Sequence, residues 1–241
     1  MVERAVTPFV DETPGEIPVR GILHRAADSS GDFLVLTRGA GGNANAALLV
    51  ALALEFVSAG ISVLRCDLPY RQRRPQGPPS SANAREDQEG LRRAITLMRE
   101  KSTGRAFLGG SSYGGRQASL LSASHPGLVE GLVLLSYPLH PPGKPAQLRT
   151  AHFLELQTPA LFVSGTKDVF GTIDELEAAI KLIPANTELV KIDGTSHGLS
   201  KQGSAKGVCR RRHTGLPELL CLNANSPLQD AFRDAGFIRN L

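Results

Sequence analysis

The chain has 241 residues, of which 41% are hydrophobic and 21% charged, and its formal net charge is +4. This length and composition are typical of a globular α/β protein and exclude a disordered, fibrous or collagen-like chain. The basic excess is concentrated in two short clusters, residues 71–74 and 206–213, so we expect no nucleic-acid-binding face.

Cysteine usage and the apolar segments indicate the compartment. The three cysteines are Cys66, Cys209 and Cys221. Because they are odd in number and lack metal-ligand spacing, we expect neither a disulfide framework nor a metal site. The first eight residues lack the apolar run of a secretory signal. The longest apolar stretch, residues 44–57, is interrupted by Glu55 and is too short to cross a bilayer. We therefore expect a cytoplasmic protein that does not bind membranes.

Predicted strands and helices alternate along most of the chain. The elements expected in chain order are an antiparallel pair of strands at 3–10 and 17–24, a strand at 32–38, a helix at 44–58, a strand at 61–68, a helix at 84–101, a strand at 105–109, a helix at 116–124, strands at 129–136 and 160–164, a helix at 173–183 and a strand at 187–192. This pattern predicts one α/β domain: a doubly wound, mostly parallel sheet with helices on both faces and a minimal cap domain or none.

Three segments depart from this regular alternation. Residues 70–83 are rich in Arg, Pro, Gly and Ser and are predicted to form an exposed loop. The proline-rich run at 140–145 cannot be regular structure, and we expect it to cover part of the molecule. Beyond the last strand, residues 201–212 are basic and only 226–235 has a helical pattern. The single domain of residues 1–241 is thus expected to comprise an opening hairpin at 1–31, a core at 32–199 and an atypical C-terminal segment at 200–241.

One motif carries chemistry by itself. The residues Gly110-Ser111-Ser112-Tyr113-Gly114 match G-x-S-x-G and stand between a predicted strand and a predicted helix. In that context the serine occupies a strained turn, and flanking glycines leave room for the tight crossing of strand and helix. Ser112 is therefore the candidate nucleophile. The alternative is a glycine-rich turn with incidental serines.

Two further residues complete a catalytic set. In parallel sheets, functional groups gather beyond the carboxyl ends of the strands. Ser112, Asp168 and His197 each follow a predicted strand, in the order nucleophile, acid and histidine. We predict that they form a triad. Asp174 and Asp193 remain alternatives for the acid. Asp168 could instead cap a surface helix, and His197 could be a surface loop residue.

Acyl transfer also needs donors for the developing oxyanion. The backbone amide of Tyr113, directly after the nucleophile, is one expected donor. The turn at residues 39–42, Gly-Ala-Gly-Gly, is expected to supply the other, with Ala40 first and Gly41 next. The same turn could bind phosphate, but it matches neither G-x-G-x-x-G nor a Walker motif.

Four basic residues suggest a substrate contact. Arg71, Arg73, Arg74 and Lys144 lie in predicted loops that should rim the catalytic end of the sheet. They could hold an anionic substrate or leaving group. Solvated loop charges are the alternative explanation.

These motifs together resemble the α/β-hydrolase superfamily, and within it the dienelactone-hydrolase-like group. The nearest likeness is to the branch that includes the testis-expressed hydrolase-like proteins and the hydrolase-like subunit of the non-specific-lethal chromatin complex. The resemblance is carried by the segments at 39–42, 109–116, 137–145, 165–168 and 196–197. Dienelactone hydrolases look like they use a cysteine nucleophile where this chain has Ser112, and Arg38 stands where many relatives have a histidine.

The resemblance implies a serine hydrolase in which Ser112, Asp168 and His197 act on a small-molecule carboxylic ester without a metal or organic cofactor. Two alternatives come from other functional classes. One is a non-catalytic scaffold with a protein partner, since one member of the branch is a complex subunit. The other is a small peptidase, because prolyl-oligopeptidase-like enzymes also carry Ser-Tyr-Gly-Gly. Intact triad residues favour the enzyme, and turnover of peptide amides would separate a peptidase from an esterase.

Overall fold

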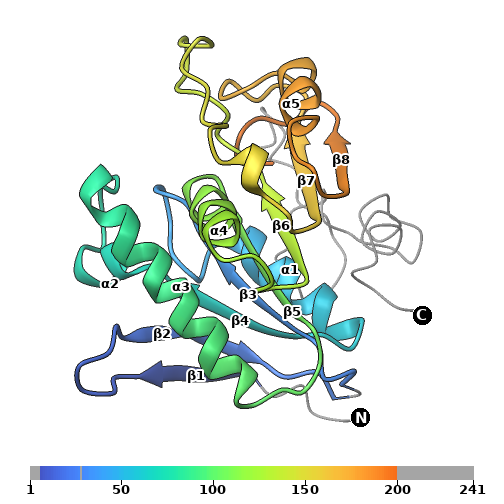
Figure 1. Ribbon diagram of the computed structural model, residues 1–241. Helices are drawn as coiled ribbons and strands as arrows, with labels where there is room; N and C mark the ends of the chain where they lie inside the picture. Colours follow the sequence, from blue (N-terminus) through green and yellow to red (C-terminus); the bar gives the residue numbers. More distant parts are fainter. Residues whose placement is uncertain (1–5, 28, 200–241) are drawn as a thin grey trace, which may run out of the picture.

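The computed structural model describes residues 6–27 and 29–199, and within them a single eight-stranded sheet is the central element (Figure 1). The strands are β1 (Val6–Asp11), β2 (Val19–His24), β3 (Phe33–Thr37), β4 (Ser62–Asp67), β5 (Ala106–Ser111), β6 (Gly131–Leu135), β7 (Ala160–Gly165) and β8 (Thr187–Ile192). Their spatial order is β1-β2-β4-β3-β5-β6-β7-β8. The hairpin β1–β2 is antiparallel and joins β4 in antiparallel fashion, and the remaining pairs are parallel.

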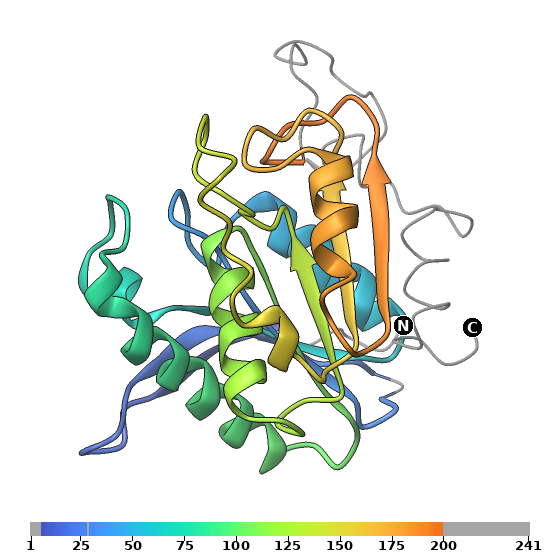
Figure 2. The same ribbon diagram turned by 45° about the horizontal axis from the view of Figure 1, so that its top comes forward.

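Helices cover both faces of this sheet. The helices are α1 (Ala47–Ser58), α2 (Pro69–Arg73), α3 (Ala84–Arg99), α4 (Tyr113–Ser124) and α5 (Ile173–Ile180). Figure 1 shows α3 and α4 in front of the sheet and α1 behind it, and Figure 2 shows α5 on the same side as α4. Each face has its own apolar core, because successive side chains of a strand point to opposite sides. Along β3, Phe33 and Val35 lie in the core under α3 and α4, whereas Leu34 and Leu36 lie in the core under α1.

The composition of each helix suits its place. α1 is almost entirely apolar, and seven of its residues are buried against the sheet. α3 is amphipathic, with its apolar face on the core and acidic Glu86 and Asp87 in its first turn, where they favour the helix dipole. The α5 helix begins with a capping box in which the Thr172 hydroxyl accepts from the Glu175 amide at 3.2 Å. These local signals agree with the observed positions of the three helices.

The predicted fold class is confirmed, and two local predictions are wrong. Residues 70–83 do not form a loop throughout: Pro69 at the first helical position starts the short helix α2, and Ser81–Asn83 is a 3-10 turn. The helix after Ser112 starts at Tyr113 and not at residue 116, because the nucleophile turn itself is the start of α4. The predictions for residues 200–241, including Cys209 and Cys221, lie outside the described residues.

In the described part of the chain, no helix combines the length and apolar character that a membrane span requires.

Candidate active site

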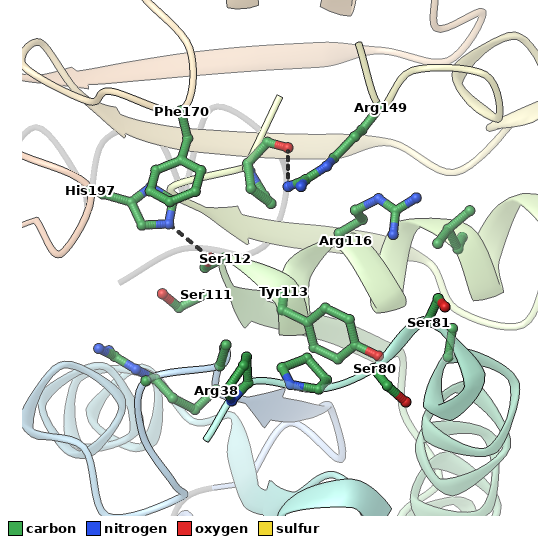
Figure 3. Close-up of a pocket in the computed structure, with 18 of the residues that line it drawn as sticks. Arg38, Ser80, Ser81, Ser111, Ser112, Tyr113, Arg116, Arg149, Phe170 and His197 are labelled. Carbon is green, nitrogen blue, oxygen red and sulfur yellow. Dashed lines mark hydrogen bonds between the residues drawn. The ribbon is translucent and has the colours of Figure 1, made fainter. Parts of the chain in front are cut away.

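Ser112 occupies a strained turn between β5 and α4. Its backbone angles are φ 54° and ψ −121°, in the left-handed half of conformational space that residues with a side chain rarely adopt. The neighbouring glycines allow this turn: a Cβ on Gly110 would lie 2.7 Å from the backbone of Gly114, and a Cβ on Gly114 would lie 2.8 Å from the Arg38 carbonyl. The tight turn points the Ser112 side chain out from the end of the sheet (Figure 3).

The loops after β7 and β8 bring Asp168 and His197 to the same edge. The two loops are joined by a hydrogen bond from the Lys167 amide to the Thr195 carbonyl at 2.9 Å. They cross so closely that a Cβ on Gly165 would lie 2.3 Å from that carbonyl oxygen, so the crossing requires glycine. Asp168 and His197 are 29 positions apart in the chain and meet beside Ser112, which precedes Asp168 by 56 positions.

The three side chains form one hydrogen-bonded chain. His197 Nε2 lies 2.8 Å from Ser112 Oγ, and His197 Nδ1 lies 2.8 and 2.9 Å from the two Asp168 oxygens. An ionised carboxylate can only accept, so Nδ1 carries the proton and donates it to Asp168. Nε2 is then left as the acceptor for the Ser112 hydroxyl. This is the tautomer in which the imidazole can remove a proton from the serine.

Phe170 fixes the orientation of the acid and of the ring. Its backbone amide donates to Asp168 Oδ1 at 2.9 Å, and its ring stacks on the His197 imidazole with centroids 4.0 Å apart and planes 29° apart. The Asp168 side chain is 1% exposed and the His197 side chain 22% exposed. The carboxylate is thus shielded from water, while the imidazole retains access to a bound molecule.

The glycine-rich turn after β3 lies directly against the Ser112 turn. A Cβ on Gly39 would be 2.8 Å from both the Ser111 carbonyl and Ser112 Cβ, and 3.1 Å from the Tyr113 amide nitrogen. The Tyr113 amide is the first of α4, one of the amides that a helix leaves without an intrahelical acceptor. The Ser112 amide is used elsewhere, since it donates to the Leu135 carbonyl at 2.8 Å. The structure therefore brings the turn that contains Ala40 and Gly41 next to Tyr113.

A buried network that the sequence analysis missed supports this turn. Asp87 on α3 accepts from the Tyr113 hydroxyl at 2.8 Å and from the Tyr70 amide at 3.0 Å. Burial raises the pKa of Asp87, and burial together with the Asp87 hydrogen bond raises the pKa of Tyr113. From α2, Arg71 Nη2 donates to the carbonyl of Ala40. The sequence could not indicate this network, because only the fold brings α2 and α3 to the turn. In the sequence, an acidic residue such as Asp87 near a helix start is explained by its favourable interaction with the helix dipole.

A cavity of about 730 Å³ opens at Ser112 (Figure 3). Its wall includes Ser112 and His197, the turn of residues 39–41, the segment of residues 78–81 and Phe170. Its other polar side chains are those of Ser111, Tyr113 and the arginines Arg38, Arg116 and Arg149. The cavity is large enough for a small organic molecule next to the serine hydroxyl.

The four basic residues suggested by the sequence do not line this cavity. Arg71 is buried and donates to the carbonyls of residues 40, 74 and 77, so it is a structural residue of the loop. Arg73 is paired with Glu86, and Arg74 donates to the carbonyls of residues 76 and 78. Lys144 is exposed. Their role in anion binding stays a prediction that this geometry does not favour, because Arg71 and Arg74 donate to backbone carbonyls and Arg73 to a carboxylate outside the cavity.

Among residues 6–27 and 29–199, no group of three His, Cys, Asp or Glu side chains is arranged to hold a metal ion. Cys66 is buried in β4, and burial raises the pKa of its thiol to about 12. That thiol is therefore protonated at neutral pH and does not offer a thiolate ligand or nucleophile.

Known proteins resemble this chain in sequence and in fold. Residues 30–213 match a family described as an alpha/beta hydrolase domain. Among solved structures, the dienelactone hydrolase from Anabaena variabilis is similar with a TM-score of 0.66 at 19% identity, over 83% of this chain and 91% of that one. The esterase PF2001 of Pyrococcus furiosus gives a TM-score of 0.62 at 14% identity, over 80% and 83%. Est1E of Butyrivibrio proteoclasticus, solved with ferulic acid bound, gives 0.63 at 16%, over 78% and 90%.

Proposed function

The chain belongs to the α/β-hydrolase family, and from that premise we propose that it is a serine hydrolase that cleaves carboxylic esters through an acyl-serine intermediate. The observation that carries the proposal is the hydrogen-bonded chain from Ser112 Oγ through His197 to the buried Asp168. A serine whose hydroxyl faces the free lone pair of an oriented imidazole is the arrangement that activates this weak nucleophile.

In the acylation step, Ser112 Oγ attacks the ester carbonyl carbon while its proton moves to His197 Nε2. The carbonyl oxygen becomes an oxyanion, and the Tyr113 amide together with the Ala40 amide, or alternatively that of Gly41, donates to it. Asp168 stabilises the imidazolium that forms. The tetrahedral intermediate then collapses: the bond to the alcohol oxygen breaks, that oxygen takes the proton from Nε2, and the acyl group stays on Ser112.

Deacylation repeats the sequence with water. His197 Nε2 removes a proton from a water molecule, whose oxygen attacks the acyl carbon. Collapse of the second tetrahedral intermediate releases the carboxylic acid and returns the proton to Ser112 Oγ. The imidazole is 22% exposed on its side chain, so water can reach Nε2 once the alcohol has left.

A small-molecule ester suits the cavity of about 730 Å³. A small carboxylic acid, ferulic acid, is bound in the Est1E structure, which has the same fold. The assignment to the testis-expressed and non-specific-lethal-complex branch is part of the same proposal and rests on the sequence motifs, as does the division into a core at residues 32–199 within one domain.

A fluorophosphonate probe tests the proposal without knowledge of the natural ester. The purified protein is treated with the probe, and the intact mass is measured for the wild type and for Ser112→Ala. One probe per chain in the wild type and none in the variant is the expected result. A folded wild type that takes up no probe would overturn the proposal and favour a non-catalytic scaffold. Hydrolysis of peptide amides at rates matching those of esters would favour a peptidase.

A further inference from the structure

We propose that the cavity beside Ser112 contains an anion subsite formed by Arg116 and Arg149, and that the preferred substrates are esters bearing a second, ionised acidic group, a carboxylate or a phosphate. This assignment of substrate class rests on the proposed ester hydrolysis. Both arginines line the cavity, and Figure 3 shows them at one side of it, with Arg38 at the other.

Arg116 is held one turn of helix away from the nucleophile. It is the fourth residue of α4, and the helical rise of about 1.5 Å per residue puts its Cα about 6 Å along the axis from that of Ser112. Its Nε is buried and, within the described part of the chain, has no hydrogen-bond partner. A ligand oxygen in the cavity would bind the terminal Nη groups of Arg116, because the buried Nε is itself out of contact with solvent.

Arg149 is presented to the same wall by a well-anchored backbone. Its amide donates to the Leu139 carbonyl at 2.8 Å, and its carbonyl accepts from the Tyr137 hydroxyl at 2.9 Å. Its Nη1 donates to the Pro138 carbonyl at 3.3 Å, a long contact that leaves the rest of the fork available. These contacts fix the position from which the backbone presents the Arg149 side chain to the cavity.

The two guanidinium groups repel each other without compensation from acidic residues. Burial lowers the pKa of Arg149, and the nearby charge of Arg116 lowers it further. The same charge contributes, after burial, to the low pKa of His152, about 4, so this neighbour is neutral at pH 7. No Asp or Glu lines the cavity, and none forms an ion pair with Arg38, Arg116 or Arg149 among residues 6–27 and 29–199. An anionic ligand would supply the missing charge.

The ligand chemistry follows from the guanidinium geometry. Carboxylate and phosphate both offer two oxygens that match the paired N–H groups of arginine, and such charge-assisted pairs are stronger than neutral hydrogen bonds. The reacting ester must sit at Ser112 Oγ, so the acidic group lies a few carbon atoms away along α4. The charge also attracts anionic substrates toward the cavity before they bind.

The test compares esters that differ only in their far end. Hydrolysis is measured by methanol release for methyl pentanoate, monomethyl glutarate and methyl 4-phosphonobutanoate, with the wild type, Arg116→Gln, Arg149→Gln and the control Arg20→Gln. Arg20 is an exposed arginine paired with Glu12 on the opening hairpin, away from the cavity. Arg116→Lys is included because it keeps the charge and loses the paired donors.

The wild type is expected to prefer an anionic ester over methyl pentanoate by at least tenfold in kcat/KM. Arg116→Gln and Arg149→Gln should each lower kcat/KM for the preferred anionic ester roughly 10- to 100-fold, mainly by raising KM. Their kcat/KM for methyl pentanoate should stay within about threefold of the wild-type value. Arg116→Lys should fall between the glutamine variant and the wild type, and Arg20→Gln should match the wild type. Whichever anionic ester is preferred identifies the carboxylate or the phosphate as the natural group.

Equal use of all three esters by the wild type would overturn the anion subsite, as would equal losses for neutral and anionic esters in the arginine variants. Probe labelling of Ser112 distinguishes that failure from failure of the proposed hydrolysis, because the neutral probe does not need the arginines. If no ester is cleaved, calorimetric titration of glutarate into Ser112→Ala decides the question. Saturable binding of glutarate to Ser112→Ala that is lost in the Ser112→Ala, Arg116→Gln double variant supports the subsite. Absence of glutarate binding to Ser112→Ala contradicts it.

Discussion

Placing a methyl group on Gly39 should damage catalysis although no side chain of the proposed triad is replaced. In the structure, an added Cβ would lie 2.8 Å from the Ser111 carbonyl and from Ser112 Cβ, and 3.1 Å from the Tyr113 amide nitrogen. Backbone contacts this short cannot be relieved by a side-chain rotation, so the turn must move away from the elbow. That movement withdraws the turn's donor from the oxyanion. Loss of one such donor costs about 2.7–4 kcal/mol, so we expect Gly39→Ala to lower kcat about 100- to 1,000-fold.

The matched control is Gly41→Ala in the same turn, where an added Cβ meets nothing within 4 Å and the backbone amide is retained. Its kcat should stay within about threefold of the wild type. Steady-state hydrolysis of a neutral ester gives kcat and KM, and thermal unfolding shows that each variant is folded at the assay temperature. If Gly39→Ala were folded and had wild-type kcat, the contact between the turn and the Ser112 elbow, and the oxyanion role of the turn, would both be refuted.

Replacing Asp168 by asparagine should lower kcat about 10⁴-fold, because an amide in this place favours the wrong tautomer of His197; a kcat within tenfold of the wild type would contradict the triad. The free energy of unfolding should fall as the pH drops from about 6.5 toward 4, because burial lowers the pKa of both His24 and His152 to about 4 and the unfolded chain then binds protons that the native chain does not. Urea titrations at several pH values measure this slope; His152→Gln should reduce it, and an unchanged slope would refute the assignment of His152. Thr172→Ala removes the cap of α5 and should lower the free energy of unfolding by about 1 kcal/mol in the same assay at pH 7, whereas no loss would show that the capping bond contributes nothing.

The alternation of strands and helices could be predicted from the sequence because each strand and each long helix has its own local hydrophobic pattern. The apolar runs of β3 and β6 are typical of strands buried on both faces, and the structure shows every residue of both buried. The helix α2 was missed for a local reason as well. Its five residues, Pro-Tyr-Arg-Gln-Arg, are too few to show helical periodicity and stand in a segment with the composition of a loop.

The sequence also indicated the three residues of the hydrogen-bonded chain, Ser112, Asp168 and His197. Each follows a strand of a parallel sheet, and the carboxyl ends of those strands meet at one edge whatever the details of side-chain arrangement. The stacking of Phe170 on His197 and the hydrogen bond from the Tyr113 hydroxyl to Asp87 were not predictable, because both depend on side-chain directions across separate elements.

The sequence by itself determined the backbone plan of this protein: the strand–helix alternation, the strained elbow at Ser112 and the positions of Ser112, Asp168 and His197 after their strands. These depend on periodicity and on local steric limits, which a run of residues carries within itself. Only the tertiary structure decided which basic residues face the cavity beside Ser112. The arginine-rich segment at residues 71–74 satisfies its charges on Glu86 and on loop carbonyls, whereas Arg116 and Arg149, unremarkable in the sequence, line the cavity without an acidic partner among the described residues. The physical reason is that a guanidinium on a long side chain is placed by its nearest acceptors, and those acceptors come from segments that only folding brings together.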